Sequence, residues 1–191
     1  MAREPKPTCY FGEVLVSIAR NHKISLREWA EDIVRQPVIS FYVRCERLPG
    51  VDTVVKLAEK LNLPRSERRR LYRARMIGSH KNPIWKPEIV DALPKARLLT
   101  PKDIERMFTR KGHSISRLAV MVDANEQVIH KIVRLEKVEI LGKRRSAVAK
   151  YLEKIAEKIG LSNEEVASVL LSLMKANDFP DDFVKTLTQG K

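Results

Sequence analysis

Apolar residues recur three and four positions apart along most of the chain, which is the period of an amphipathic α-helix. No stretch alternates apolar and polar residues for long enough to predict a β-strand. The helical segments are expected at residues 9–21, 25–34, 37–45, 51–61, 66–77, 101–111, 114–122, 125–136, 144–159, 162–176 and 180–187, with a further short helix near 87–93. The pattern therefore predicts an all-α protein.

Residues suited to helix N-caps stand at the start of several of these segments. They are Ser25, Thr100, Ser114, Asn125 and Ser162, whose side-chain oxygens can accept a hydrogen bond from an N–H of the first turn. Pro101 follows Thr100 at the first helical position, where its fixed φ is compatible with the helix. Glu165 stands three residues after Ser162, which predicts a capping box.

A proline-rich segment, "GSHKNPIWKPEIVDALPKARLLTP", separates two sets of predicted helices. Proline at this density ends helices and stiffens the chain, whereas Ile84, Trp85 and Ile89 within the segment need burial. We expect an N-terminal domain at residues 1–78, a connector at 79–99 that packs on one or both domains, and a C-terminal domain at 100–191 with extra C-terminal helices.

The order of elements repeats in the two halves. "SLREWA" corresponds to "SISRLA", and "VVKLAEKLNLP" corresponds to "YLEKIAEKIGLS". Ala30 and Ala119 stand five positions after Ser25 and Ser114, where a small residue lets two steeply crossing helices approach. Asp123 stands at the corner between two short helices and tolerates a left-handed backbone better than most residues. The pattern indicates a diverged internal duplication.

The stretch "SISRLAVMVDANEQVIHKIVRL", residues 114–135, resembles the helix-turn-helix of the lambda-repressor-like (Cro/Xre-type) family, without gaps as far as Arg134. "SLREWAEDIVRQPVISFYVRC" resembles it with one residue fewer in the turn. The resemblance implies two helix-turn-helix domains in tandem, each with its second helix in the DNA major groove. Leu26 and Ile115 replace the Gln that often contacts phosphate in this family, so that contact is not expected.

In the second copy the resemblance implies DNA contacts by Asn125, Glu126, Gln127, His130, Lys131 and Arg134. Gln can pair with adenine, Lys with guanine and Glu with cytosine, and Arg134 is better placed for a phosphate. In the first copy the corresponding residues are Gln36, Val38, Ser40, Phe41 and Arg44. There Gln36 can read adenine, and Val38 or Phe41 can contact a thymine methyl group. For the polar residues of the second copy, the alternative is a solvated helix face. For the apolar residues of the first copy, the alternative is packing against the connector or a partner chain.

The charge balance favours a polyanionic partner. The chain has 191 residues with 37 Lys+Arg and 24 Asp+Glu, a formal net charge of +13. Residues 1–99 carry 20 basic and 11 acidic groups, and residues 100–191 carry 17 and 13, so both halves are basic. DNA, RNA and an anionic membrane face share this preference. Lys143, Arg144 and Arg145 precede a predicted helix N-terminus, which favours phosphate contact there.

Several kinds of site are not expected. Cys9 and Cys45 lie far apart without a CxxC pattern, so we expect two reduced cysteines and no metal site. No apolar run is long enough to cross a membrane, and the chain starts without an apolar export segment. We expect a cytoplasmic, nucleoid-associated protein without a cofactor.

These observations predict a sequence-specific double-stranded DNA-binding transcriptional regulator, a repressor of the phage, plasmid or mobile-element type. The alternative is a sequence-tolerant architectural, partition or RNA-binding protein. An enzyme is not expected, because no nucleophile, carboxylate cluster or phosphate-binding loop is evident. A homodimer is also open, because the apolar face of "EEVASVLLSLMKAND" either completes the core or forms a dimer seam.

Overall fold

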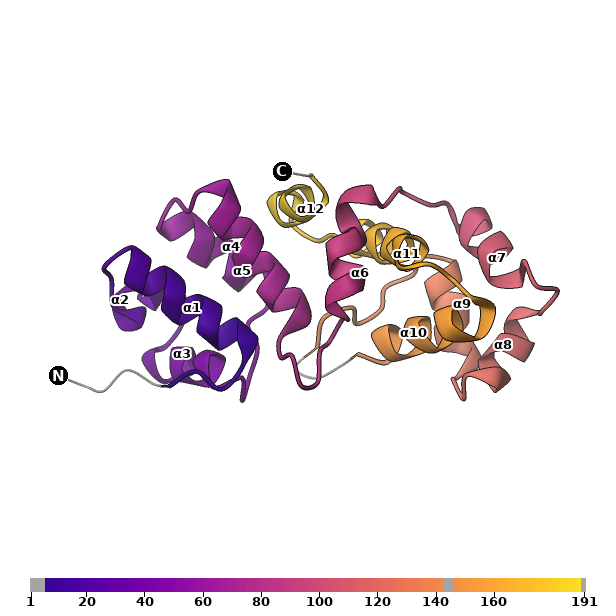
Figure 1. The fold of residues 1–191 in the computed structure, drawn as a ribbon, viewed down its shortest axis with the longest axis horizontal. Helices are drawn as coiled ribbons and strands as arrows, with labels where there is room; N and C mark the ends of the chain where they lie inside the picture. The colour runs from indigo at the N-terminus through magenta and orange to yellow at the C-terminus, as the bar shows by residue number, and fades with distance from the viewer. Residues whose placement is uncertain (1–5, 143–145, 190–191) are drawn as a thin grey trace. The chain divides into compact units, whose positions relative to one another are not determined.

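The computed structural model describes residues 6–142 and 146–189, and within these ranges it is helical with no β-strand, as the sequence predicts. The elements are α1 (Tyr10–Asn21), α2 (Leu26–Ala30), α3 (Gln36–Val43), α4 (Val51–Lys60), α5 (Arg65–Ile77), α6 (Pro87–Ala92), the 3-10 helix η1 (Leu93–Lys95), α7 (Pro101–Thr109), α8 (Ile115–Met121), α9 (Glu126–Val133), α10 (Ala147–Ile159), α11 (Asn163–Ala176) and α12 (Asp181–Thr188) (Figure 1).

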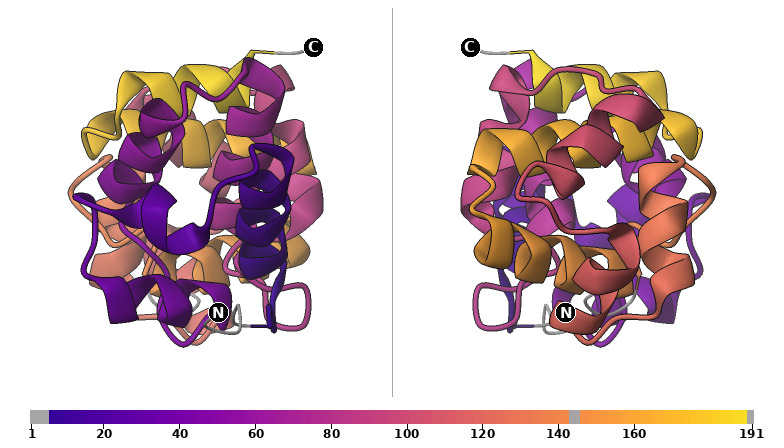
Figure 2. Two further views of the ribbon diagram at one scale, coloured as in Figure 1. Left: turned by 90° about the vertical axis from the view of Figure 1, so that its left-hand side faces the viewer. Right: turned by 90° about the vertical axis from the view of Figure 1, so that its right-hand side faces the viewer.

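The chain divides into two compact units. The first contains the residues up to Lys86 together with Pro180–Gln189, and the second contains Pro87–Phe179. In Figures 1 and 2 the helices of the first unit run from indigo to magenta, with α12 in yellow. This division differs from the expected domain ranges of 1–78, 79–99 and 100–191, because α6 belongs to the second unit and α12 to the first.

The physical reason lies in the apolar residues of the two reassigned segments. Ile89, Val90 and Leu93 of the proline-rich segment are buried, and α6 packs on α11 within the second unit. In the first unit Phe183 of α12 stacks on Tyr72 of α5, with ring centroids 4.7 Å apart. The connector is therefore split between the two cores, with Ile84 and Trp85 buried in the first.

Pro180 occupies the N-cap of α12, so Asp182 does not cap this helix. Instead Tyr72 donates its hydroxyl to Asp182 Oδ2 at 2.6 Å, and Arg68 lies 3.4 Å from Oδ1. Burial raises the pKa of Tyr72, and the neighbouring Asp182 raises it further. These contacts fix α12 against α5.

The arginines of α5 are largely engaged within the first unit. Arg70 donates to Ser17 Oγ at 3.1 Å and Arg73 to the Tyr10 hydroxyl at 2.9 Å. Arg75 is 2% exposed and donates Nε to the Pro49 carbonyl at 2.5 Å. Burial lowers the pKa of Arg75 to about 10. Several arginines of α5 therefore stabilise the first unit through hydrogen bonds, which the sequence alone does not indicate.

The two cysteines correct a sequence-based expectation. Cys9 and Cys45 are disulfide-bonded, with Cα atoms 6.0 Å apart, rather than separate and reduced. Cys9 is the N-cap of α1, and Cys45 follows the C-cap of α3 in the left-handed region, with φ 53°. The bond closes only when α3 packs on α1, a long-range arrangement that cysteine spacing does not reveal.

Gly12 of α1 lies against the C-terminal end of α3. A Cβ at this position would collide with the carbonyl of Val43 and lie only 3.0 Å from its Cα. We expect Gly12→Ala to lower the free energy of unfolding by about 1–3 kcal/mol, the usual cost of overpacking, despite the better helix propensity of alanine. Urea denaturation followed by tryptophan emission measures this loss in the first unit, because Trp29 and Trp85 both lie in it.

Gly50→Ala is the matched control, since a Cβ on Gly50 meets no atom within 4 Å and its φ is −63°. We expect that variant to stay within about 0.5 kcal/mol of the wild type. Equal stability of the two variants would contradict the close approach of α1 and α3.

In the second unit α11 is buried along almost its whole length. The residues that suggested a dimer seam, Val166, Val169, Leu170, Leu173 and Met174, are all buried within the unit. Ser172 Oγ accepts the N–H of Leu99 at 2.8 Å and Ser168 Oγ accepts that of Arg97 at 3.1 Å, which pins the segment before α7 along α11. The apolar face of α11 thus completes the core rather than forming a dimer seam.

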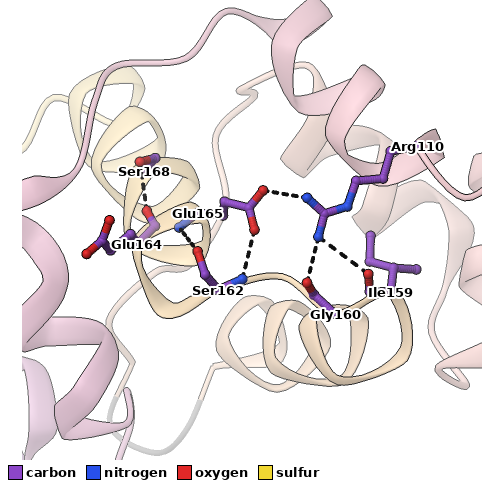
Figure 3. Close-up of polar contacts among 7 residues, drawn as sticks. All are labelled: Arg110, Ile159, Gly160, Ser162, Glu164, Glu165 and Ser168. Atoms are coloured by element: carbon purple, nitrogen blue, oxygen red, sulfur yellow. Dashed lines mark hydrogen bonds and ion pairs between the residues drawn. The ribbon is translucent and has the colours of Figure 1, made fainter.

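Arg110, the C-cap of α7, joins three helices of the second unit (Figure 3). It donates to the Gly160 carbonyl at 2.6 Å at the end of α10, and it forms an ion pair with Glu165 at 2.5 Å. Glu165 also closes the predicted capping box with Ser162. Burial is the largest single influence on the pKa of Glu165 and raises it. The hydrogen bonds with Ser162 and Arg110 and the charge of Arg110 together outweigh burial, so the pKa is lowered.

The two units repeat one helical order, in which α1–α5 correspond to α7–α11. The backbone after the third helix repeats closely. Cys45 donates its N–H to Tyr42 and Leu135 to Ile132, both at 3.2 Å, and both donors have positive φ. More residues separate α9 from α10 in the second unit than separate α3 from α4 in the first.

Candidate nucleic-acid interface

The pair α8–α9 is fixed by local capping. Ser114 Oγ accepts the N–H of Arg117 at 3.2 Å, and Asn125 Oδ1 accepts that of Gln127 at 2.9 Å. Asp123, between the helices, has φ 52°, which is the left-handed corner that the sequence predicts. These features determine where α9 begins and how it leaves α8.

One face of the pair is sealed by aliphatic side chains. Leu118, Ile129 and Ile132 are 0% exposed. Ala119, where the two helices meet, is 2% exposed, so no larger side chain would fit without separating them. This packing leaves the opposite side of α9 facing solvent.

The outward side of α9 carries Gln127, Lys131 and Arg134, which are all exposed. Gln127 and Lys131 stand one helical turn apart, and neither side chain makes a hydrogen bond or ion pair with the described residues. They present an amide and an ammonium group side by side. An amide can bond bidentately to adenine, and an ammonium can donate to guanine.

Glu126 makes two contacts within the unit that the sequence did not predict. Its Oε1 accepts the Ser116 hydroxyl at 2.5 Å and lies 3.3 Å from His130 Nε2. The hydrogen bond from Ser116 is the main reason that the pKa of Glu126 is lowered, and His130 lowers it further. The carboxylate therefore links α9 to α8.

His130 and Arg134 border a surface hollow of about 520 Å³ between α7, α8 and α9. Lys102 and Glu105 of α7 line the same hollow. His130 is half-buried, and Arg134 Nη1 lies 3.7 Å from Glu136 Oε1. Arg134 remains exposed and is compatible with a phosphate contact at the edge of the row.

The corresponding residues of α3 lie at a constant offset of 90 positions. Gln36 matches Glu126, Phe41 matches Lys131, and Arg44 matches Arg134. The amide oxygen of Gln36, in the orientation that satisfies the amide, accepts two hydrogen bonds from Arg27 of α2. In both units, therefore, the first residue of the candidate reading helix (Gln36 of α3, Glu126 of α9) accepts hydrogen bonds from the helix before it.

The remaining predicted residues of α3 present few free polar groups. Val38 and Ser40 are half-buried, and Phe41 is 37% exposed. Arg44 forms an ion pair with Glu46 at 2.7 Å. The turn before α3 also differs, because α2 ends at Ala30 and the left-handed residue is Asp32.

Ser116 and Arg27 are site residues that the sequence reasoning missed. Each stands two positions after the capping serine of its helix and contacts the first residue of the next helix. The internal repeat could have indicated them, because Arg27 and Ser116 occupy the same position of the repeat. Lys143, Arg144 and Arg145, which were predicted to contact phosphate, lie outside the described residues.

No protein-family model, curated protein or solved structure matches the chain. Among residues 6–142 and 146–189, no helix is long and apolar enough to cross a membrane. In the same ranges no three His, Cys, Asp or Glu side chains gather as metal ligands.

Proposed function

We propose that the protein is a sequence-specific double-stranded DNA-binding regulator whose α9 lies in the major groove. The observation that carries this proposal is the pair Gln127 and Lys131, exposed, one turn apart and without partners among the described residues, on a helix whose other face is sealed. The net charge of +13 supports attraction to the phosphate backbone.

The resemblance of α8–α9 to the lambda-repressor-like helix-turn-helix gives the proposed docking geometry. In that arrangement the N-terminal part of the second helix contacts base edges. Gln127 lies in the first turn of α9 and Lys131 in the second, so both would reach neighbouring bases. We therefore propose a repressor of the phage, plasmid or mobile-element type, acting on cytoplasmic DNA.

Selection of binding sites from random duplexes tests this function. We expect the full chain to enrich one sequence motif. We expect Gln127→Ala and Lys131→Ala each to lose roughly 1–3 kcal/mol of discrimination at a fixed position of that motif. Lys158→Ala removes an exposed lysine from α10 and is the matched control, with unchanged preference.

The competing role is a sequence-tolerant architectural, partition or RNA-binding protein. Binding that weakens steeply with salt but enriches no motif would support that role and contradict ours. An enriched motif that neither Gln127→Ala nor Lys131→Ala alters would show that α9 does not read the bases.

A further inference from the structure

The two units present different chemistry at matching positions. Gln127 and Lys131 on α9 correspond to Pro37 and Phe41 on α3, at the constant offset of 90 positions. Phe41 is one of the few large hydrophobic residues with an exposed side chain. Neither Pro37 nor Phe41 has a side-chain donor or acceptor, so these two positions of α3 cannot form hydrogen bonds with a base edge.

The side chains of Gln36 and Arg44, near the two ends of α3, are engaged within the unit. The guanidinium carbon of Arg44 lies 5.7 Å from the centroid of the Phe41 ring, and its Nε contacts Glu46 Oε1 at 2.7 Å. Gln36 is held by Arg27 on the preceding helix. The chemistry that this part of α3 offers a partner is therefore predominantly apolar.

Arginines flank this apolar row at both ends. Arg35 is the N-cap of α3, and Arg47 follows the helix by four residues. Both are exposed, and neither side chain forms a hydrogen bond or ion pair with the described residues. Two unpaired cations around a narrow apolar strip suit the DNA major groove, where phosphates flank base edges that include the thymine methyl group.

We propose that α3 selects thymine by contact of Phe41 with its 5-methyl group, while α9 selects bases by hydrogen bonds. This inference rests on the proposed function and assigns the two units different modes of reading. It also gives a physical reason to bind DNA in preference to RNA, because uracil lacks the methyl group.

Replacing thymines of the selected site one at a time by deoxyuridine tests the inference, since only the methyl group is removed. At one or two positions we expect the wild-type Kd to rise about fourfold, the effect of losing burial of one methyl-sized group. Phe41→Ala should bind the thymine and deoxyuridine duplexes equally at those positions. Phe41→Leu, which keeps an apolar contact, should retain a preference for thymine.

Lys131→Ala is the control in the other unit. It should keep the thymine preference and lose discrimination only at the base position that Lys131 contacts. Tryptophan emission of each Phe41 variant verifies that the first unit is folded. Equal binding of every deoxyuridine duplex by the wild type overturns the inference but leaves the proposed function intact. Failure to enrich any motif overturns both.

A third result identifies a different partner. If Phe41→Ala changes the oligomeric state of the chain while the thymine preference persists, the apolar row is a protein contact. That outcome also overturns methyl reading by α3.

Discussion

Trp29→Ala is expected to lower the free energy of unfolding by about 3–5 kcal/mol, the range for deleting a large aromatic side chain from a core. Trp29 is 0% exposed, and its indole Nε1 donates to the Leu57 carbonyl at 2.8 Å. Leu57 lies in the last turn of α4, where carbonyl groups lack helical partners. The substitution therefore leaves both a cavity and an unpaired acceptor.

The effect should be measurable by urea denaturation, with far-UV circular dichroism and the emission of Trp85 as two independent signals. Trp29→Phe is the control, because it keeps most of the ring and loses the N–H. We expect a smaller loss for it, about 1–3 kcal/mol. If Trp29→Ala cost less than 1 kcal/mol, the side chain could not be the anchor that the structure shows.

The consequence for function follows from the length of α2. A helix of five residues, Leu26–Ala30, is too short to be stable without tertiary contacts. Trp29 attaches it to α4, and Arg27 of the same helix holds Gln36 at the start of α3. Loss of Trp29 should therefore displace α3 as well, and the DNA binding that we propose for the first unit should weaken with it.

Local features of the fold could be predicted from the sequence because their causes are local. Ser114 and Asn125 were expected as N-caps, and both accept a first-turn N–H. Asp123 was expected at a left-handed corner and has φ 52°. Helix caps and left-handed corners depend on a few neighbouring residues, so a short segment of sequence is enough to predict them.

Features that join distant segments could not be predicted in the same way. The run "RSERRRLYRAR" does not indicate that the distant Pro49 carbonyl accepts a hydrogen bond from Arg75. The return of α12 to the first unit depends on the stacking of Phe183 on Tyr72, more than a hundred residues away in sequence. Such contacts follow from the packing of whole helices.

The candidate interface combines both cases. The outward row Gln127 and Lys131 follows from helical periodicity once the buried face is known, and the structure leaves it exposed. The hydrogen bond from Ser116 to Glu126 joins two helices across the corner, and such a contact could not be predicted from the sequence of α9 alone. The same backbone frame thus tolerates different outward residues, which permits the two units to recognise different chemistry.

Removing the disulfide is expected to destabilise the first unit by about 4 kcal/mol, because the bond closes a loop with a sequence separation of 36 residues and restricts the unfolded chain. The double variant Cys9→Ser and Cys45→Ser tests this without leaving a free thiol. Serine at position 9 can still cap α1, as the Cys9 sulfur does by accepting the N–H of Gly12.

Urea denaturation followed by tryptophan emission should give the same midpoint for the double variant and for the wild type in reductant. Oxidised wild type should unfold at a higher concentration. A midpoint that is insensitive to reductant, together with two free thiols by mass spectrometry under non-reducing conditions, would contradict the bonded pair.

The loss should not abolish the fold. The second unit has the same helical order with Thr100 as the N-cap of its first helix and Leu135 at the position of Cys45, so the frame forms without the bond. Gly12 still allows α1 to approach Val43, which keeps α3 in place. Under reducing conditions we therefore expect the dithiol form to keep the DNA sequence preference proposed above, at lower stability. A changed preference on reduction would instead make the bond a determinant of how α3 is presented to DNA.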